Sequence, residues 1–178
     1  LKWHSNIVAM ETTLPSGLKR LDFCDTLGIM DHGSVHPTVF DVPTQWHNLH
    51  SLHSLTELKI TLRRELTVEE VKWMPRSLLS LQAYSSLFRP TFVTQEICKA
   101  LPPMLTSLSG HFDCMNDVRF LPPLIRDLRI ELQMTTLGLS EAQRQELRVL
   151  HVKNLDKTTA KLLPSRLERL KAFQVPAE

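Results

Sequence analysis

Histidine residues at regular spacing are the first side chains in this sequence that could do chemistry. His47, His50 and His53 recur every third residue, so on a helix they would share part of one face. Imidazoles grouped in this way can bind a transition metal. A strong site would add a carboxylate or a thiol, and none is adjacent, so we expect no metal here. The pattern instead favours an amphipathic helix with a polar histidine face. Its apolar side would consist of Leu49, Leu52 and Leu55.

A cysteine nucleophile is the second candidate. His111 and Cys114 lie close together in the sequence, with Asp113 between them. A Cys–His pair needs side chains within hydrogen-bond reach, and closeness in sequence alone does not bring them together. No G-x-S-x-G, H-E-x-x-H, G-x-x-x-x-G-K-[ST] or G-x-G-x-x-G motif occurs in the chain. We therefore expect that the protein is not an enzyme, and that it has no catalytic residues and no cofactor.

The elements that would position these residues repeat along the chain. Residues 14–23 have the pattern L-P-x-x-L-x-x-L-x-φ, in which φ is apolar or small. The pattern recurs from residues 74, 101, 121 and 163, and copies without the proline begin at residues 51 and 143. Leu1 and Trp3 fit the last apolar positions of a further copy. Leucine accounts for 31 of the 178 residues, and many of these leucines occupy repeat positions, which indicates a repeat protein.

These copies resemble the repeats of leucine-rich repeat proteins, in the L-P-x-x-L-x-x-L form found in protist proteins and in bacterial effector ubiquitin ligases. The resemblance covers nearly the whole chain and implies a solenoid. The acyl-transfer cysteine of those ligases would lie in a separate domain, and nothing here matches one. There is one departure, because the family usually carries Asn or Cys three residues after φ. The residues at that position here are Thr26, Arg63, Ser86, Asp113, Gln133, Leu155 and Val175.

Each copy predicts a strand followed by a short helix. The last Leu and φ alternate with polar residues, which is typical of a half-buried strand of about three to five residues. Stacked in parallel, such strands would bury their apolar side chains in one continuous core. The motif proline directly follows three of the four expected helices, and proline cannot continue a helix, so it marks the helix end and the start of a strand. The expected helices span residues 67–74, 94–101, 140–147 and 156–163, each with Thr, Ser or Asp at the N-cap.

We therefore predict a single α/β domain over residues 1–178, a leucine-rich repeat solenoid or horseshoe of about seven to eight repeats. Short parallel strands would line its concave face, and short helices or turns its convex face. Residues 25–48 would form an inserted loop, and loops of that length are often functional. The chain begins without Met or a signal peptide, and its three cysteines are widely spaced. We expect a fragment of a longer cytoplasmic or otherwise intracellular protein.

Residues that alternate with the core positions should point outward from the sheet in three columns. Each column takes one residue from each strand, and neighbouring strands are about 4.8 Å apart. The first column is Arg20, Glu57, Ser80, Ser107, Asp127, Val149 and Arg169. The middle column is Asp22, Lys59, Gln82, Ser109, Arg129, His151 and Lys171. The third column is Cys24, Thr61, Tyr84, His111, Glu131, Lys153 and Phe173. Aromatic residues and arginine are favoured interface anchors. The residues that we expect to bind a partner are Tyr84, Ser109, His111, Arg129, His151, Lys153, Lys171 and Phe173.

The predicted function is that of a non-enzymatic scaffold that binds a protein partner through the concave face. The C-terminal end of that face is the more basic, so we expect an acidic patch on the partner. The chain has 21 basic and 19 acidic residues, and the signs of charge alternate along the columns, so nucleic acid is disfavoured as a partner. No apolar run is long enough to span a membrane, so no membrane partner is expected either.

Three other functions stay open. The chain could be the substrate-recognition segment of a larger enzyme such as a ubiquitin ligase, which a catalytic domain elsewhere in the full sequence would reveal. It could be a structural subunit of a large assembly, which predicts aggregation when it is expressed alone. RNA binding, the least favoured, predicts a steep dependence of affinity on salt.

Overall fold

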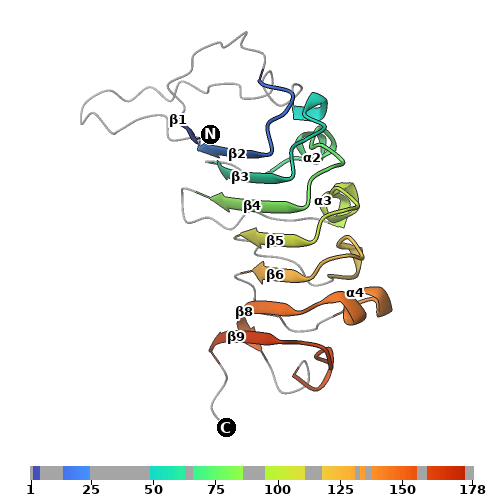
Figure 1. Cartoon of the computed structure of the whole chain (residues 1–178). Helices are drawn as coiled ribbons and strands as arrows, with labels where there is room; N and C mark the ends of the chain where they lie inside the picture. The colour runs from blue at the N-terminus through green and yellow to red at the C-terminus, as the bar shows by residue number, and fades with distance from the viewer. Residues whose placement is uncertain are drawn as a thin grey trace, which may run out of the picture.

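The repeated copies form one parallel sheet. The computed structural model describes residues 2–4, 14–24, 49–62, 66–85, 95–110, 118–130, 133–134, 138–155 and 160–174, and its strands stack along the sequence (Figure 1). Strands β1 to β6 pair with one another in sequence order. Strand β8 then pairs with β6, and also with β7 and β9. The strands are β1 (Lys2–His4), β2 (Arg20–Cys24), β3 (Glu57–Leu62), β4 (Ser80–Ser85), β5 (Ser107–Gly110), β6 (Asp127–Ile130), β7 (Gln133–Met134), β8 (Val149–Leu155) and β9 (Arg169–Gln174).

Short helices cover one side of this sheet (Figure 1). They are the α-helices α2 (Val68–Lys72), α3 (Gln95–Ala100) and α4 (Glu141–Glu146), and the 3-10 helices η1 (Leu49–Ser51) and η2 (Val118–Phe120). The helices predicted within residues 67–74, 94–101 and 140–147 are thus confirmed. The fourth predicted helix falls partly outside the described residues, and residues 160–161 within it are helical.

The predicted N-caps Thr67 and Ser140 are confirmed, and each is part of a capping box, in which the N-cap residue and the residue three positions later exchange hydrogen bonds. The Thr67 hydroxyl accepts the Glu70 N–H at 3.3 Å, and the Glu70 carboxylate accepts the Thr67 N–H at 2.8 Å. The same exchange joins Ser140 and Gln143 at 3.3 and 2.8 Å. Each box satisfies N–H groups that have no partner within the first helical turn, so these short helices start at fixed positions.

The motif proline opens a tight turn that lies between the end of the helix and the start of the strand. In each of the five proline copies the N–H three residues later donates to the proline carbonyl, at 3.0–3.4 Å. The strand then begins five residues after the proline, as in Pro75 and Ser80. Leu52 takes the same place in a copy without proline, because its carbonyl accepts the Leu55 N–H at 2.9 Å.

A second recurring contact ties each repeat to the next. The carbonyl of the residue just before a strand accepts two consecutive N–H groups of the following repeat. The Thr56 carbonyl, for example, accepts those of Leu79 and Ser80, both at 2.9 Å. We call these contacts the double-acceptor links. The other acceptors of this kind are Lys19, Leu79, Thr106, Arg126 and Arg148.

The core lies between the sheet and the helices. Its main column contains the last leucine of each copy, and from Leu21 to Leu150 these side chains are at most 4% exposed. Burying one leucine stabilises a fold by about 1.5–3 kcal/mol, so the column is a large part of the stability. It ends at Leu170, which is 44% exposed because β9 pairs with a described strand on one side only.

The architecture is therefore an α/β fold with an open parallel sheet and repeated strand units. Some strands are longer than the predicted three to five residues, and β8 reaches seven, because pairing continues beyond the φ position. The predicted loop over residues 25–48 lies outside the described residues. Within the described part of the chain, no helix has the length and apolar character needed to cross a bilayer.

Candidate functional site: the open face of the sheet

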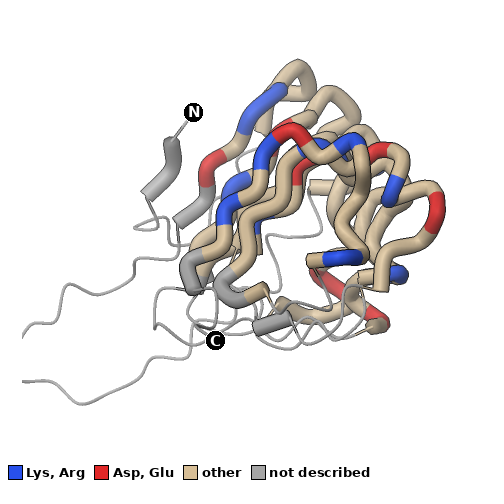
Figure 2. Tube along the Cα trace, turned by 90° about the horizontal axis from the view of Figure 1, so that it is seen from below, with Lys and Arg blue, Asp and Glu red and all other residues tan. Residues whose placement is uncertain are grey.

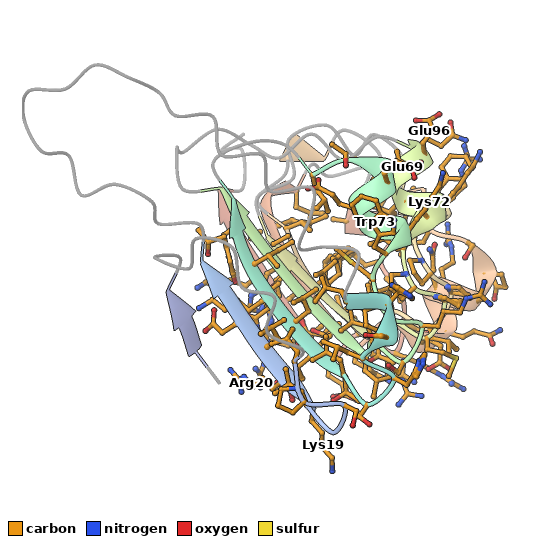
Figure 3. All side chains as sticks on the ribbon, turned by 90° about the horizontal axis from the view of Figure 1, so that it is seen from above. Lys19, Arg20, Glu69, Lys72, Trp73 and Glu96 are labelled. Carbon is orange, nitrogen blue, oxygen red and sulfur yellow. The ribbon has the colours of Figure 1, made fainter. Side chains whose placement is uncertain are left out.

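The sheet face that points away from the helices is the candidate site, and we call it the open face. Figure 3 shows Arg20 on this side, whereas Glu69, Lys72 and Trp73 lie with the helices on the other. Strand pairing aligns the first two outward columns over β2, β3, β4, β5, β6, β8 and β9 as predicted, so their register is confirmed. In the third column, Cys24, Thr61 and Tyr84 are aligned. The open face consists of Arg20, Asp22, Glu57, Lys59, Thr61, Ser80, Gln82, Tyr84, Ser107, Ser109, Asp127, Arg129, Val149, His151, Arg169 and Lys171.

The N-terminal part of the open face neutralises its own charges. The Arg20 guanidinium lies 3.3 Å from the Glu57 carboxylate on the next strand. Asp22 and Lys59, which are also directly opposite each other on these two strands, form a second pair with the charges reversed, with 3.7 Å between Nζ and Oδ2. Exposed pairs of this kind contribute at most about 1 kcal/mol each to stability. Their larger effect is on recognition, because they leave this end of the face without net charge.

The central part of the open face is uncharged. Its two strands, β4 and β5, present small polar side chains in the first two columns. The Tyr84 hydroxyl lies 3.3 Å from the Ser109 hydroxyl, and Ser109 is buried. The tyrosine therefore spans from its own strand to the next and offers an aromatic surface, a type of group that frequently anchors an interface.

The C-terminal part begins with a salt bridge within one strand. Arg129 donates from Nε and Nη2 to the two oxygens of Asp127, at 2.8 and 2.7 Å. This hydrogen-bonded contact and the negative charge of Asp127 raise the pKa of Arg129. The guanidinium is thus a fixed cation on the open face, held in the two-point geometry that arginine and carboxylates prefer.

His151 occupies the middle column between Arg129 and Lys171. Burial lowers its pKa, and the positive charges of Arg129, Lys171 and Arg169 add to this effect, while Asp127 opposes it. Its Nε2 atom is buried and has no hydrogen-bond partner among the described residues. The imidazole is therefore neutral at neutral pH, because burial and the cations on both sides of it disfavour its protonated form.

The charge of the open face is therefore uneven. Beyond the Asp127–Arg129 pair, β8 and β9 add Arg169 and Lys171 to the first two columns and no acidic residue. Figure 2 shows the stacked strands from the C-terminal end of the sheet, with basic residues in blue and acidic residues in red. The described open face is neutral at its N-terminal end and cationic at its C-terminal end.

Most of the predicted partner-binding residues lie on the open face. The structure places the side chains of Tyr84, Ser109, Arg129, His151 and Lys171 there. His111 lies outside the described residues. Lys153 and Phe173 belong to β8 and β9, and their side chains lie outside the described part.

The set of partner-binding residues predicted from the sequence omitted Asp127 and Arg169, which belong to the same cluster as Arg129 and His151. Both occupy the first outward column, and Asp127 is two residues before Arg129 on one strand, which places the two side chains on the same face. This spacing of opposite charges was the feature in the sequence that could have identified the pair.

The histidine group and the cysteines have other surroundings. The predicted apolar side is confirmed, because Leu49, Leu52 and Leu55 are buried. His50 and His53 are exposed. The segment forms a 3-10 helix and a turn instead of an α-helix. Three potential ligands close enough for a metal ion do not occur among the described His, Cys, Asp and Glu residues. His47, His111, Asp113 and Cys114 lie outside the described part of the chain.

Comparison of the chain with protein-family models, with curated proteins and with solved structures found no match. The geometry of the open face is therefore the basis for assigning a function.

Proposed function

We propose that the chain is a leucine-rich repeat solenoid, that its open face is the concave side of a horseshoe, and that this face binds a protein partner without catalysing a reaction. The observation that carries the proposal is a parallel sheet whose described helices all lie on one side (Figure 1). Parallel sheets are usually covered on both faces. In repeat proteins, by contrast, the uncovered face of the stacked strands serves as an extended binding surface.

The side chains on the open face support recognition of a protein. Tyr84 and Arg129 are of the types that most often dominate binding energy at interfaces. Both are held by contacts within the face, Tyr84 by Ser109 and Arg129 by Asp127, so less side-chain entropy would be lost on binding. The strand backbones are already paired within the sheet, which leaves recognition to these side chains.

Affinity capture with cross-linking from cells that contain the protein tests the proposal. The variant is Tyr84→Ala/Arg129→Ala/His151→Ala, and the matched control is Lys72→Ala/Arg76→Ala/Lys161→Ala, whose residues are exposed and lie outside the open face. We expect the first variant to lose the captured partner and the control to retain it, with similar unfolding midpoints. Cross-links should map to strands β4 to β9. Equal capture by wild type and the open-face variant would show that the partner binds elsewhere.

A further inference from the structure

The basic end of the open face has a composition that restricts what it can bind. We define this basic end as Arg129, His151, Arg169 and Lys171. Neighbouring strands are about 4.8 Å apart, so Arg129 and Lys171 start from backbones roughly 10 Å apart, with His151 between them. Two cations thus flank a neutral imidazole in one row.

Among the described residues, the charged groups around His151 come from the two strands that pair with β8. Asp127 and Arg129 lie on β6, and Arg169 and Lys171 lie on β9. On its own strand, the described neighbour on the same face is the apolar Val149. In the described part of the chain, three cations and one carboxylate therefore surround the imidazole, and Arg129 already engages both oxygens of that carboxylate.

We propose that the basic end binds aspartate and glutamate side chains of the protein partner, and that this binding takes up a proton on His151. The inference rests on the proposed function and specifies the chemistry of the partner. A carboxylate placed over this row adds the negative charge that the row lacks. The field that disfavours a charged imidazole is then reversed, and protonation becomes favourable in the complex.

This coupling has a definite direction. A proton that binds more tightly to the complex than to the free protein makes the complex tighter as the pH falls, by at most about tenfold per pH unit for one group. The effect requires His151 to titrate near neutrality, which is the range of histidine. A partner that binds through fixed charges alone would show no such dependence.

Other features of the open face favour an acidic protein segment over a nucleic acid. Asp127 lies at the edge of the basic end and would repel a continuous phosphate backbone. The N-terminal part of the face is neutralised by its own ion pairs, so it offers no track for a long polyanion. Tyr84 is the one aromatic residue of the open face as defined above, whereas single-stranded nucleic acids need several stacking platforms.

A labelled hexaglutamate peptide is the probe for this proposal, with binding followed by fluorescence anisotropy at fixed, low ionic strength. We expect the wild-type chain to bind at least about fivefold more tightly near pH 6 than near pH 7.5, within the limit for one proton. Arg169→Gln/Lys171→Gln should weaken binding at both pH values. His151→Gln should retain binding at about pH 7.5 and lose the pH dependence, because glutamine resembles the neutral imidazole and cannot titrate.

The matched control is Arg20→Gln/Lys59→Gln, which removes the same charge from the N-terminal part of the open face. Unfolding midpoints measured for all variants establish that they are folded. Equal weakening by the control, the absence of pH dependence in the wild type, or an unchanged dependence in His151→Gln would overturn the proposal. So would stronger binding of a hexauridylate of matched charge, which would assign the basic end to RNA. The capture experiment stands apart from this one, because a partner lost from the Tyr84→Ala/Arg129→Ala/His151→Ala variant would support protein binding even if hexaglutamate does not bind.

Discussion

Arg129 and Asp127, two residues apart on β6, are joined through both carboxylate oxygens, with donor–acceptor distances of 2.8 and 2.7 Å. The contact fixes the guanidinium along its own strand instead of towards the next one. It also places a negative charge at the edge of the basic end, beside His151. Asp127 therefore limits how strongly this surface attracts an anion.

Replacing that carboxylate should strengthen the binding of an acidic segment. Asp127→Asn removes one negative charge beside the basic end, and this gain in attraction should outweigh the loss of the contact that holds Arg129, so we expect hexaglutamate to bind several-fold more tightly at low ionic strength. Stability should change by less than about 1 kcal/mol, because the pair is exposed. Anisotropy and thermal unfolding measure the two effects. The control Glu57→Gln removes a negative charge at the N-terminal end of the open face and should leave the affinity for hexaglutamate nearly unaltered. Weaker binding in Asp127→Asn would contradict the prediction and would mean that the salt bridge orients Arg129 for binding.

The stability of the fold should depend on the protonation of His151. Because burial and the neighbouring cations lower its pKa, the unfolded chain binds more protons than the folded chain at pH values just below the ordinary histidine pKa of about 6.5. The free energy of unfolding should therefore rise with pH through this window and level off above about 6.5. Urea unfolding at a series of pH values measures the slope. His151→Gln should reduce it, whereas a slope that is the same in both proteins would contradict the lowered pKa.

Truncation of the leucine column should be costly. Leu128 is 0% exposed, so Leu128→Ala should lower the free energy of unfolding by about 2–5 kcal/mol through lost burial and a residual cavity. Leu79 is 40% exposed and provides the control, since Leu79→Ala should cost less than about 1 kcal/mol. Chemical denaturation of both variants makes the comparison. Similar losses at the two positions would show that β6 does not bury its leucine as described.

Gln143 should contribute substantially to the free energy of unfolding, although it is a polar residue in the core. Its side-chain amide donates to the carbonyls of Val118 and Leu121 at 2.9 and 2.8 Å, and it is 2% exposed. Gln143→Ala would remove the side-chain hydrogen bonds to the Leu121 carbonyl and the Ser140 N–H, and would leave the Val118 carbonyl with the Leu121 N–H as its donor, at a cost of about 1–3 kcal/mol.

The charge variant Gln143→Glu gives a second measurement for this position. It retains the acceptor for the cap but places a carboxylate against two carbonyls, so it should also be destabilising at neutral pH. Gln145→Ala, at an exposed position on the same helix, should change the free energy of unfolding by no more than about 0.5 kcal/mol. If the three variants unfold at the same denaturant concentration, the bridge from α4 to η2 has no energetic importance.

The strand register could be predicted from the sequence because it depends only on the alternation of apolar and polar residues along each strand. Leu128 and Ile130 must point into the core, so Asp127 and Arg129 must point out of it, and no other information is needed. The capping box of Thr67 and Glu70 is equally local, since both partners lie within one helical turn.

The side-chain partners on the open face could not be obtained in this way. Tyr84 and Ser109 are 25 residues apart, and their contact depends on the rotamer of the tyrosine. The pKa of His151 depends on burial and on charges contributed by the two neighbouring strands. The turn after the motif proline was missed for a different reason, because the same residue can end a helix and open a turn.

The double-acceptor links join each repeat to its immediate neighbour and to no more distant one. A gain or loss of one residue between a link and the strand that follows it would shift the pairing of that strand and turn its outward residues inward. A gain or loss of a complete repeat would leave all the remaining links intact and change the length of the open face by one strand, about 4.8 Å. Evolution can therefore adjust the reach of this surface in whole steps, by duplication or deletion of a unit, without redesigning the rest of the protein.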